Sequence, residues 1–297
     1  MTIASREFVA WLTLCVTWGT TWMFLKVGLR DVTPLTYSGA RMTLTFAVLA
    51  PMLWGRREAR PRTASQWRFV ALLGLFQIAV PFALNAWAIR FVPSSLVAIL
   101  FSVHPLFVIV LAHFLIPGEH MRARTLAGAV CGIAGVTAIC WQQLGLGRAN
   151  ALSVMAMIAS ALSSAVANII AKRRQEQIDA IVNTAYQTLL GGLMLLALAF
   201  VWEQPLATHF TPRSLGALAY LVTVGSGLGF TLFYWLIKRV EVTLVSFTVI
   251  INTLIATLLG WLVMDERLGW HTLAGGALIL TGTLLVITQR RSGMEKK

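Results

Sequence analysis

Apolar residues run along almost the whole chain in long blocks that short polar stretches separate. Each block has the roughly 20 residues that a helix needs to cross the hydrocarbon core of a bilayer. The connections between blocks are short, which leaves no room for a separate soluble domain. The pattern predicts an all-α integral membrane protein with ten transmembrane helices, at residues 8–29, 33–54, 67–89, 92–116, 122–142, 150–171, 180–202, 214–237, 242–264 and 270–289.

Composition supports this reading. The chain has 297 residues, of which 58% are apolar and only 12% are charged, whereas a soluble domain has about 25% charged residues. Most of its surface must therefore face something other than water. The three cysteines (Cys15, Cys131 and Cys140) lie inside apolar blocks without the paired spacing of metal ligands, so we expect no metal and no cofactor.

The basic charge is explained by topology. If the N-terminus lies in the cytoplasm, 17 of the 24 lysine and arginine residues fall on the cytoplasmic side and 5 on the outer side. The positive-inside rule then predicts that both termini are cytoplasmic. We therefore expect the lipid bilayer as partner and no nucleic acid, although the formal net charge is +13.

An internal repeat divides the chain. The stretches "LIPGEHMRARTLAGAVCGIAG" (115–135) and "LVMDERLGWHTLAGGALILTG" (262–282) share seven residues at an offset of 147 positions, among them Glu119/Glu266 and Gly135/Gly282. We predict a first five-helix repeat at 1–145 and a second at 146–297. Because five is odd, the second repeat must be inverted, which is the architecture of alternating-access carriers.

Several stretches resemble a known family. "WGTTWMFLKVG", "PLTYSGARMTLTFAVL" and "NAWAIRFVPSSLVAILFSVHPLFVIVLAHFLIPGE" are similar, in pattern and order, to the EamA family of the drug/metabolite transporter superfamily. Within it the chain looks most like the YddG-type exporters of aromatic and other amino acids. The resemblance implies a multi-pass carrier of the bacterial inner membrane. The second repeat departs from the pattern, because Asn252-Thr253 stands where the first has His104-Pro105.

Arg41 is the leading candidate for binding a substrate. It lies about eight residues inside the second block, roughly 12 Å deep at 1.5 Å per residue, with Tyr37 one turn away on the same face. It is suited to attract a substrate carboxylate; the alternative is that it ties helix ends or carbonyls together, or snorkels. None of the eleven acids falls at mid-span, which argues against exchange of protons for cationic drugs.

Aromatic and polar residues at mid-span are further candidates. Trp18, Trp22 and Lys26 share one helix face. The tryptophans form either an aromatic wall or ordinary packing. Lys26 is expected to snorkel outward, with binding of the substrate as the lesser alternative. Six other polar residues come from helices of both repeats, which favours a shared polar cavity over isolated interhelical hydrogen bonds. They are Gln77, Asn85, Asn168, Gln187, Ser226 and Asn252.

Proline and glycine mark interruptions in the helices. Pro81 in "FQIAVPF" and Gly225, Gly227 and Gly229 in "VGSGLGF" fall in corresponding blocks of the two repeats, which indicates hinges at a transport site. The glycine pairs of the fifth and tenth blocks predict tight packing, with dimerisation as the lesser alternative.

His104-Pro105 interrupts the fourth block near its middle. Proline removes a backbone donor, so we expect a bend that frees the carbonyl of Phe101. His104 has three readings: a neutral imidazole bonded to a neighbouring helix, a substrate contact, or a carrier of a coupling proton. We favour a hinge at Pro105, with His104 as a hydrogen-bonding wall residue.

These observations predict a carrier that exports amino acids, aromatic and other apolar or neutral ones. The alternatives are export of another small metabolite or a lipophilic drug and, more remotely, a channel or structural membrane protein. The sequence has no H-E-x-x-H, nucleophile elbow or phosphate loop, so we expect no enzyme. We expect a monomer, with a dimer as the alternative.

Overall fold

The computed structural model describes residues 5–116, 123–174, 178–205, 208–237, 239–240 and 242–294, and every regular element in these ranges is helical. Six of the predicted blocks are single helices. These are α1 (Ser5–Gly28), α7 (Ala123–Leu146), α8 (Arg148–Arg174), α9 (Ala180–Trp202), α12 (Val242–Met264) and α13 (Trp270–Met294).

The other four blocks are interrupted helices. They are α2 (Pro34–Leu49) with the 3-10 helix η1 (Ala50–Ala59); α3 (Ala64–Leu73), the π-helix η2 (Gly74–Ala79) and α4 (Val80–Ala88); α5 (Ser94–Phe101) and α6 (His104–Leu115); and α10 (Pro212–Tyr220), the π-helix η4 (Leu221–Leu228) and α11 (Gly229–Ile237).

Among the described residues, 6 helices are long and apolar enough to cross a membrane, and three shorter apolar helices lie at Leu126–Trp141, Thr248–Met264 and Trp270–Leu285. Large apolar side chains on the outer surface, such as Phe200, Trp202 and Trp270, are exposed, as expected where the surrounding medium is lipid. The fold is thus that of an all-helical membrane protein. The count of ten spans and the cytoplasmic termini stay predictions.

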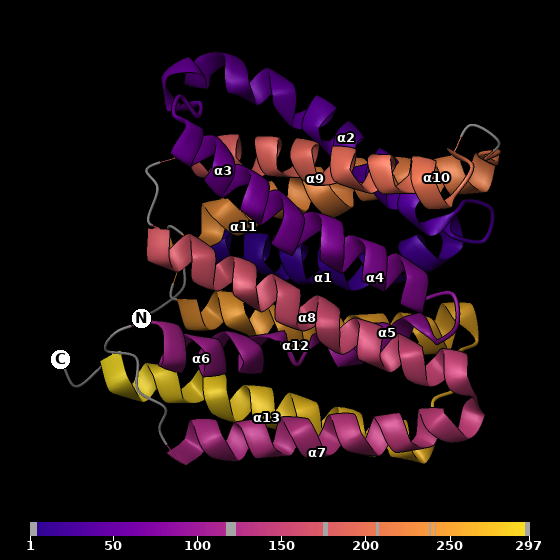
Figure 1. Ribbon diagram of the computed structural model, residues 1–297. Helices are drawn as coiled ribbons and strands as arrows, with labels where there is room; N and C mark the ends of the chain where they lie inside the picture. Colours follow the sequence, from indigo (N-terminus) through magenta and orange to yellow (C-terminus); the bar gives the residue numbers. More distant parts are fainter. Residues whose placement is uncertain are drawn as a thin grey trace.

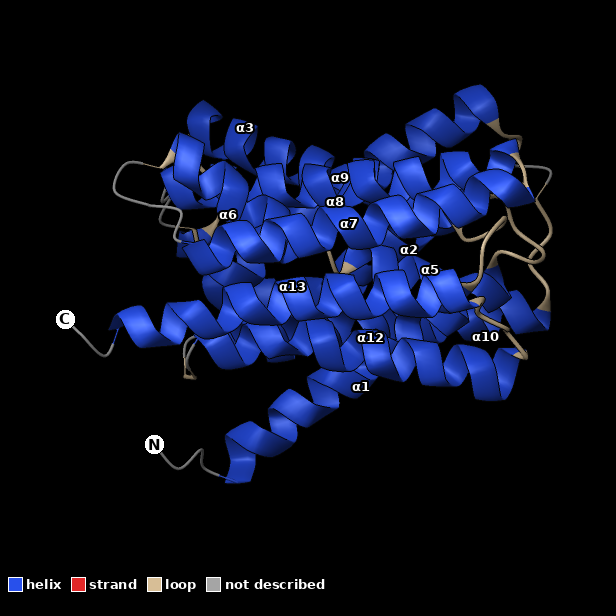
Figure 2. Cartoon of the chain, turned by 90° about the horizontal axis from the view of Figure 1, so that it is seen from below, coloured by secondary structure: helices blue, strands red, loops and turns tan. Residues whose placement is uncertain are grey.

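The helices form one bundle of long, roughly antiparallel rods (Figure 1). α7 and α13 pack along each other at one edge, α2 packs on α9 toward the opposite edge, and α1 on α12 and α4 on α8 lie between them. α1 begins and α13 ends at the same end of the bundle, as both views show (Figures 1 and 2).

Glycines bring α7 and α13 into close contact. A Cβ added at Gly275 would lie 2.7 Å from the carbonyl oxygen of Gly135, and one added at Gly135 would meet the carbonyl of Gly275 in return. Gly282 approaches the carbonyl of Gly128 in the same way. The two helices are therefore antiparallel and touch backbone to backbone, which confirms the tight packing predicted for these glycines.

The interruptions occur where proline and glycine predicted them. In η2 the amide of Val80 donates to the carbonyl of Leu75, five residues back, just before Pro81. The carbonyl of Phe76 accepts a 2.8 Å hydrogen bond from Ser163 Oγ of α8. In η4 the amide of Gly229 likewise donates to the carbonyl of Val224. Both corresponding blocks thus contain a π-helical turn, a feature common at functional sites.

The fourth block breaks at the predicted place. α5 ends at Phe101 and α6 begins at His104, with Pro105 in its first turn, where a missing amide hydrogen costs no hydrogen bond. The buried carbonyl of Ser102 accepts a 3.0 Å hydrogen bond from Thr283 Oγ1 of α13. The neighbouring helix thereby satisfies part of the backbone that the break exposes.

Candidate functional site

Arg41 lies on α2 in the interior, where α2, η4 and α4 meet. Only 6% of the surface of Arg41 is exposed. Its Nε donates a 3.2 Å hydrogen bond to Ser226 Oγ of η4, and its guanidinium carbon lies 5.1 Å from the centroid of the Phe82 ring of α4. The structure therefore brings together Arg41 and Ser226, two predicted site residues that are far apart in the sequence.

Gly225 allows α1 to approach this place. A Cβ added at Gly225 would lie 3.0 Å from Thr21 Cγ2 of α1 and 3.4 Å from Arg41 Nη2. A Cβ here would be tight against Thr21 and in ordinary contact with Arg41, so the glycine brings η4 close to α1.

A row of rings begins at Trp22. The centroids of Trp22 and Phe101 are 5.7 Å apart, and the rings of Phe101 and His104 stack 5.7 Å apart with an interplanar angle of 3°. The three side chains are partly buried. The row therefore runs from α1 across the break between α5 and α6, and it offers flat apolar faces.

His104 is bonded to α8. Its Nε2 lies 3.2 Å from Asn168 Nδ2, and the ring also hydrogen-bonds the backbone of Ser164. The contact joins α6 to α8 and brings His104 and Asn168, two predicted site residues, together.

Trp18 and Tyr37 make contacts of a different kind. Trp18 packs against Phe230 and Phe233 of α11, with centroid distances of 6.2 and 5.4 Å. Tyr37 is fully buried, and its hydroxyl donates to the backbone carbonyl of Ser214 at 3.4 Å. Trp18 thus packs between α1 and α11, and Tyr37 joins α2 to α10.

The remaining predicted polar residues are spread through the bundle. Asn85 accepts a 2.6 Å hydrogen bond from Ser160 Oγ, which ties α4 to α8. Gln187 is buried and accepts from Asn183 on its own helix. Asn252 accepts from Thr253 beside it, and Gln77 lies within η2, partly buried. The structure does not gather these four at one point.

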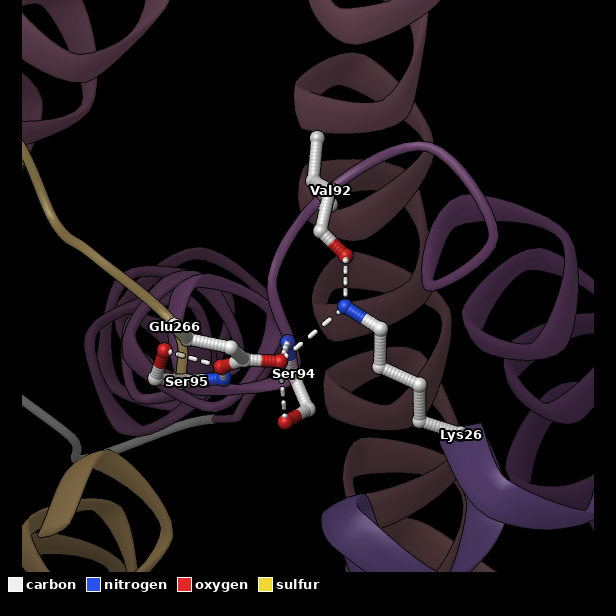
Figure 3. Close-up of polar contacts among 5 residues, drawn as sticks. All are labelled: Lys26, Val92, Ser94, Ser95 and Glu266. Carbon is white, nitrogen blue, oxygen red and sulfur yellow. Dashed lines mark hydrogen bonds and ion pairs between the residues drawn. The ribbon is translucent and has the colours of Figure 1, made fainter. Parts of the chain in front are cut away.

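A carboxylate network joins the last turn of α1, the start of α5 and the loop between α12 and α13 (Figure 3). Glu266, in the loop between α12 and α13, accepts from the amide and hydroxyl of Ser94 at 2.7 and 2.8 Å and from those of Ser95 at 3.0 and 2.6 Å. Lys26 Nζ lies 3.0 Å from Glu266 Oε1 and 3.3 Å from the carbonyl oxygen of Val92. The N-terminus of α5 thus binds a carboxylate that α1 also holds.

The hydrogen bonds decide the charge state of Glu266. Burial by itself would raise the pKa of this carboxyl group, but hydrogen bonds from Ser95 and Ser94 and the charge of Lys26 outweigh it and lower the pKa from 4.5 to about 2. Lys26 had been expected to snorkel into the surroundings; instead it pairs with Glu266, because the loop brings the carboxylate within reach. Among the predicted features, only the Glu119/Glu266 repeat hinted at this network, and Glu119 lies outside the described residues.

Two more carboxylates join helix ends. Glu203, just after α9, accepts from the amides of Leu35 and Thr36 at the start of α2, both at 2.9 Å. Asp179 caps α9 and pairs with Arg56 of η1 at 2.7 Å. α2 and α9 are therefore tied at both ends by acids at helix N-termini.

Comparison with known proteins identifies similar chains. The sequence model of the EamA-like transporter family matches residues 6–141 and 151–288. An uncharacterized transporter of Bacillus subtilis, YoaV, is 24% identical over 92% of this chain and 94% of its own. Protein PagO of Salmonella typhimurium is 24% identical over 95% and 93% of the two chains.

Similarity also extends to an archaeal chain and to a solved structure. An uncharacterized transporter of Archaeoglobus fulgidus is 24% identical over 92% of this chain and 94% of its own. A crystal structure of a protein that is 19% identical superposes with a TM-score of 0.68, covering 97% of this chain and 100% of that one. This likeness shows a shared fold. The relatives named as transporters indicate transport, not catalysis.

Proposed function

Since the chain belongs to the EamA-like transporter family, we propose that it is a carrier that exports amino acids, aromatic and other apolar or neutral ones, across the bacterial inner membrane. The observation that carries the proposal is Arg41, a buried cation that bonds to Ser226 of η4. A row of rings, Trp22, Phe101 and His104, lies on α1, α5 and α6. A charge buried in a membrane protein is costly and marks a functional site. Here the cation would hold a carboxylate and the rings would hold the side chain.

The proposed mechanism is alternating access between two inverted five-helix repeats, residues 1–145 and 146–297. The two matched ranges of the family model support the division. So do the reciprocal glycine contacts of α7 and α13: Gly135 meets Gly275, and the residues 147 positions away on each side, Gly282 and Gly128, meet in turn. A two-fold axis that runs across the helices and relates α7 to α13 would produce reciprocal contacts of this kind.

The helix breaks are proposed as the hinges. η2 and η4 lie in corresponding blocks, and the break of α5 and α6 adds a third site of interrupted backbone hydrogen bonding. Such breaks allow one half of a helix to move relative to the other. The proposed hinge residues are Pro81, Pro105, Gly225, Gly227 and Gly229.

The proposed lining of the transport path is drawn from both repeats. Arg41, Trp22, His104, Asn168 and Ser226 carry the proposal. Arg41 bonds to Ser226, His104 bonds to Asn168, and Phe101 joins Trp22 to His104. Preference for aromatic substrates, as in the YddG-type exporters, is supported by the same row. The other proposed lining residues are Trp18, Tyr37, Gln77, Asn85, Gln187 and Asn252.

The test is uptake of radiolabelled phenylalanine, tryptophan and leucine into liposomes that contain the purified protein, with and without a pH gradient. We expect saturable uptake that protein-free liposomes lack. Because no acid lies at mid-span, the gradient should change the rate only weakly. Absence of uptake for every amino acid would refute amino-acid export, and strict dependence on the gradient would refute weak coupling.

A further inference from the structure

Arg41 is a buried cation without an acidic partner among the described residues. Two ion pairs, Lys26–Glu266 and Arg56–Asp179, lie at the ends of helices and do not involve Arg41. The sequence places every acid near a helix end or in a loop. No carboxylate of the described residues therefore neutralises the positive charge of Arg41.

Most of the donors of Arg41 remain for a ligand. A guanidinium has five N–H donors, and the hydrogen bond to Ser226 uses the one on Nε. The ring of Phe82 covers one face of the group, 5.1 Å from its central carbon, which leaves the edge with the Nη atoms for hydrogen bonding. The two Nη atoms of arginine match the two oxygens of a carboxylate.

Among the described residues, the polar side chains beside this cation offer hydroxyl groups and no negative charge. Ser226 bonds to Arg41 Nε, and Thr21 lies next to Gly225. An ammonium ion that is removed from water needs an opposite charge to offset its desolvation. A zwitterion would gain from Arg41 at one end and lose at the other.

We propose that the site recognises the carboxylate of its substrate through Arg41 and does not recognise an amino group. The inference rests on the proposed function and specifies its substrate class: compounds with one carboxylate and an apolar or aromatic body, with or without an amino group. A carboxylate that lacks the amino group is bound at least as tightly as the amino acid with the same side chain. A second negative charge finds no cation, since Lys26 is already paired with Glu266.

The test measures binding to the full-length protein in detergent, so it is independent of transport. Quenching of tryptophan fluorescence gives dissociation constants for phenylalanine, for 3-phenylpropanoate, which lacks the amino group, and for 2-phenylethylamine, which lacks the carboxylate. We expect 3-phenylpropanoate to bind as tightly as phenylalanine or more tightly. We expect 2-phenylethylamine to bind at least about tenfold more weakly.

Variants then assign the effect to Arg41. Arg41→Lys keeps the charge but loses the two-pronged geometry, and should weaken binding of 3-phenylpropanoate about tenfold. Arg41→Gln should abolish the preference for 3-phenylpropanoate over 2-phenylethylamine. Arg90→Gln, at an exposed arginine, is the matched control and should bind as the wild type does.

The outcomes separate this inference from the proposed function. If phenylalanine binds tenfold more tightly than 3-phenylpropanoate, the ammonium group is recognised and the inference is overturned. The inference also fails if 2-phenylethylamine binds as tightly as 3-phenylpropanoate, or if none of the three ligands binds. These comparisons on the wild type hold even if an Arg41 variant fails to fold. The expected binding order without any uptake into liposomes would leave the site standing and refute the carrier.

Discussion

Glu266→Gln is the perturbation whose effect follows most directly from the structure. The side chain of Glu266 is 5% exposed and accepts four hydrogen bonds from Ser94 and Ser95 in addition to the ion pair with Lys26. Glutamine keeps one oxygen acceptor, but its NH2 group replaces the other. The N–H or O–H groups that donated to the lost oxygen then face another donor and have no acceptor. The variant therefore loses acceptors for about half of the network.

The magnitude follows from these contacts. Hydrogen bonds to a charged acceptor contribute about 1.5–3 kcal/mol each, and a buried donor left without a partner costs a similar amount. Lys26 is 27% exposed, so its ammonium group regains water and adds little to the loss. We expect the variant to be less stable by about 3 kcal/mol, which lowers the midpoint of thermal unfolding by roughly 5–10 °C.

The assay is thermal unfolding in detergent between pH 3 and pH 8, with Asp265→Asn as the control. Asp265 is exposed and has a φ of 53°, a conformation that asparagine tolerates. The control thus removes the same charge one residue away without removing a helix cap. It should melt within about 1 °C of the wild type, because an isolated surface charge contributes little.

The dependence on pH follows from the direction of the shift. The pKa of Glu266 in the folded protein is lowered from 4.5 to about 2, so its stabilisation is complete above about pH 4.5 and is lost as the pH falls toward 2. The difference in melting midpoint between the wild type and Glu266→Gln should be constant from pH 5 to 8 and should shrink below that. Equal midpoints at pH 7, or an equal loss in Asp265→Asn, would refute the reasoning.

Three further predictions concern the role of His104, the packing of α7 on α13 and the orientation of the chain in the membrane. His104→Gln keeps a hydrogen-bonding group toward Asn168 but cannot titrate. We expect several-fold weaker substrate binding and an unchanged pH profile of uptake. Loss of the pH response of uptake would instead assign proton coupling to His104. Gly275→Ala places a Cβ 2.7 Å from the Gly135 carbonyl oxygen and should lower the melting midpoint by several degrees. Gly216→Ala is the control: its Cβ has nothing within 4 Å, so it should raise the midpoint slightly. Equal effects of the two variants would contradict the tight packing of α7 and α13. Thr208→Cys should react with an impermeant thiol reagent added to intact cells, and reaction only after the cytoplasm is opened would overturn the cytoplasmic placement of the termini.

Residue patterns along single segments predicted much of the fold. Runs of apolar residues gave the helices, and Pro81, Pro105 and the glycines around Ser226 marked the places where α-helical hydrogen bonding is interrupted. These features are local: proline removes a donor in its own turn, and glycine permits close approach in its own turn. The structure confirms them for that reason.

Such patterns could not predict the contacts between segments that are distant in the sequence. Trp18, Trp22 and Lys26 share one face of α1 by spacing, yet Trp18 packs on α11, Trp22 reaches α5 and Lys26 pairs with Glu266, 240 residues away. Spacing fixes the face of a helix on which a residue lies. Which neighbour covers each turn of that face depends on how the whole bundle packs.

The central claim, carriage by alternating access, is tested most directly by counterflow. Liposomes that contain the protein are loaded with unlabelled phenylalanine and diluted into a trace of labelled phenylalanine. A carrier exchanges one for the other, so the account predicts that labelled phenylalanine transiently accumulates inside above its equilibrium level, and that the initial rate saturates with concentration. Labelled phenylalanine that rises to equilibrium without an overshoot, at a rate independent of the internal phenylalanine, would contradict it.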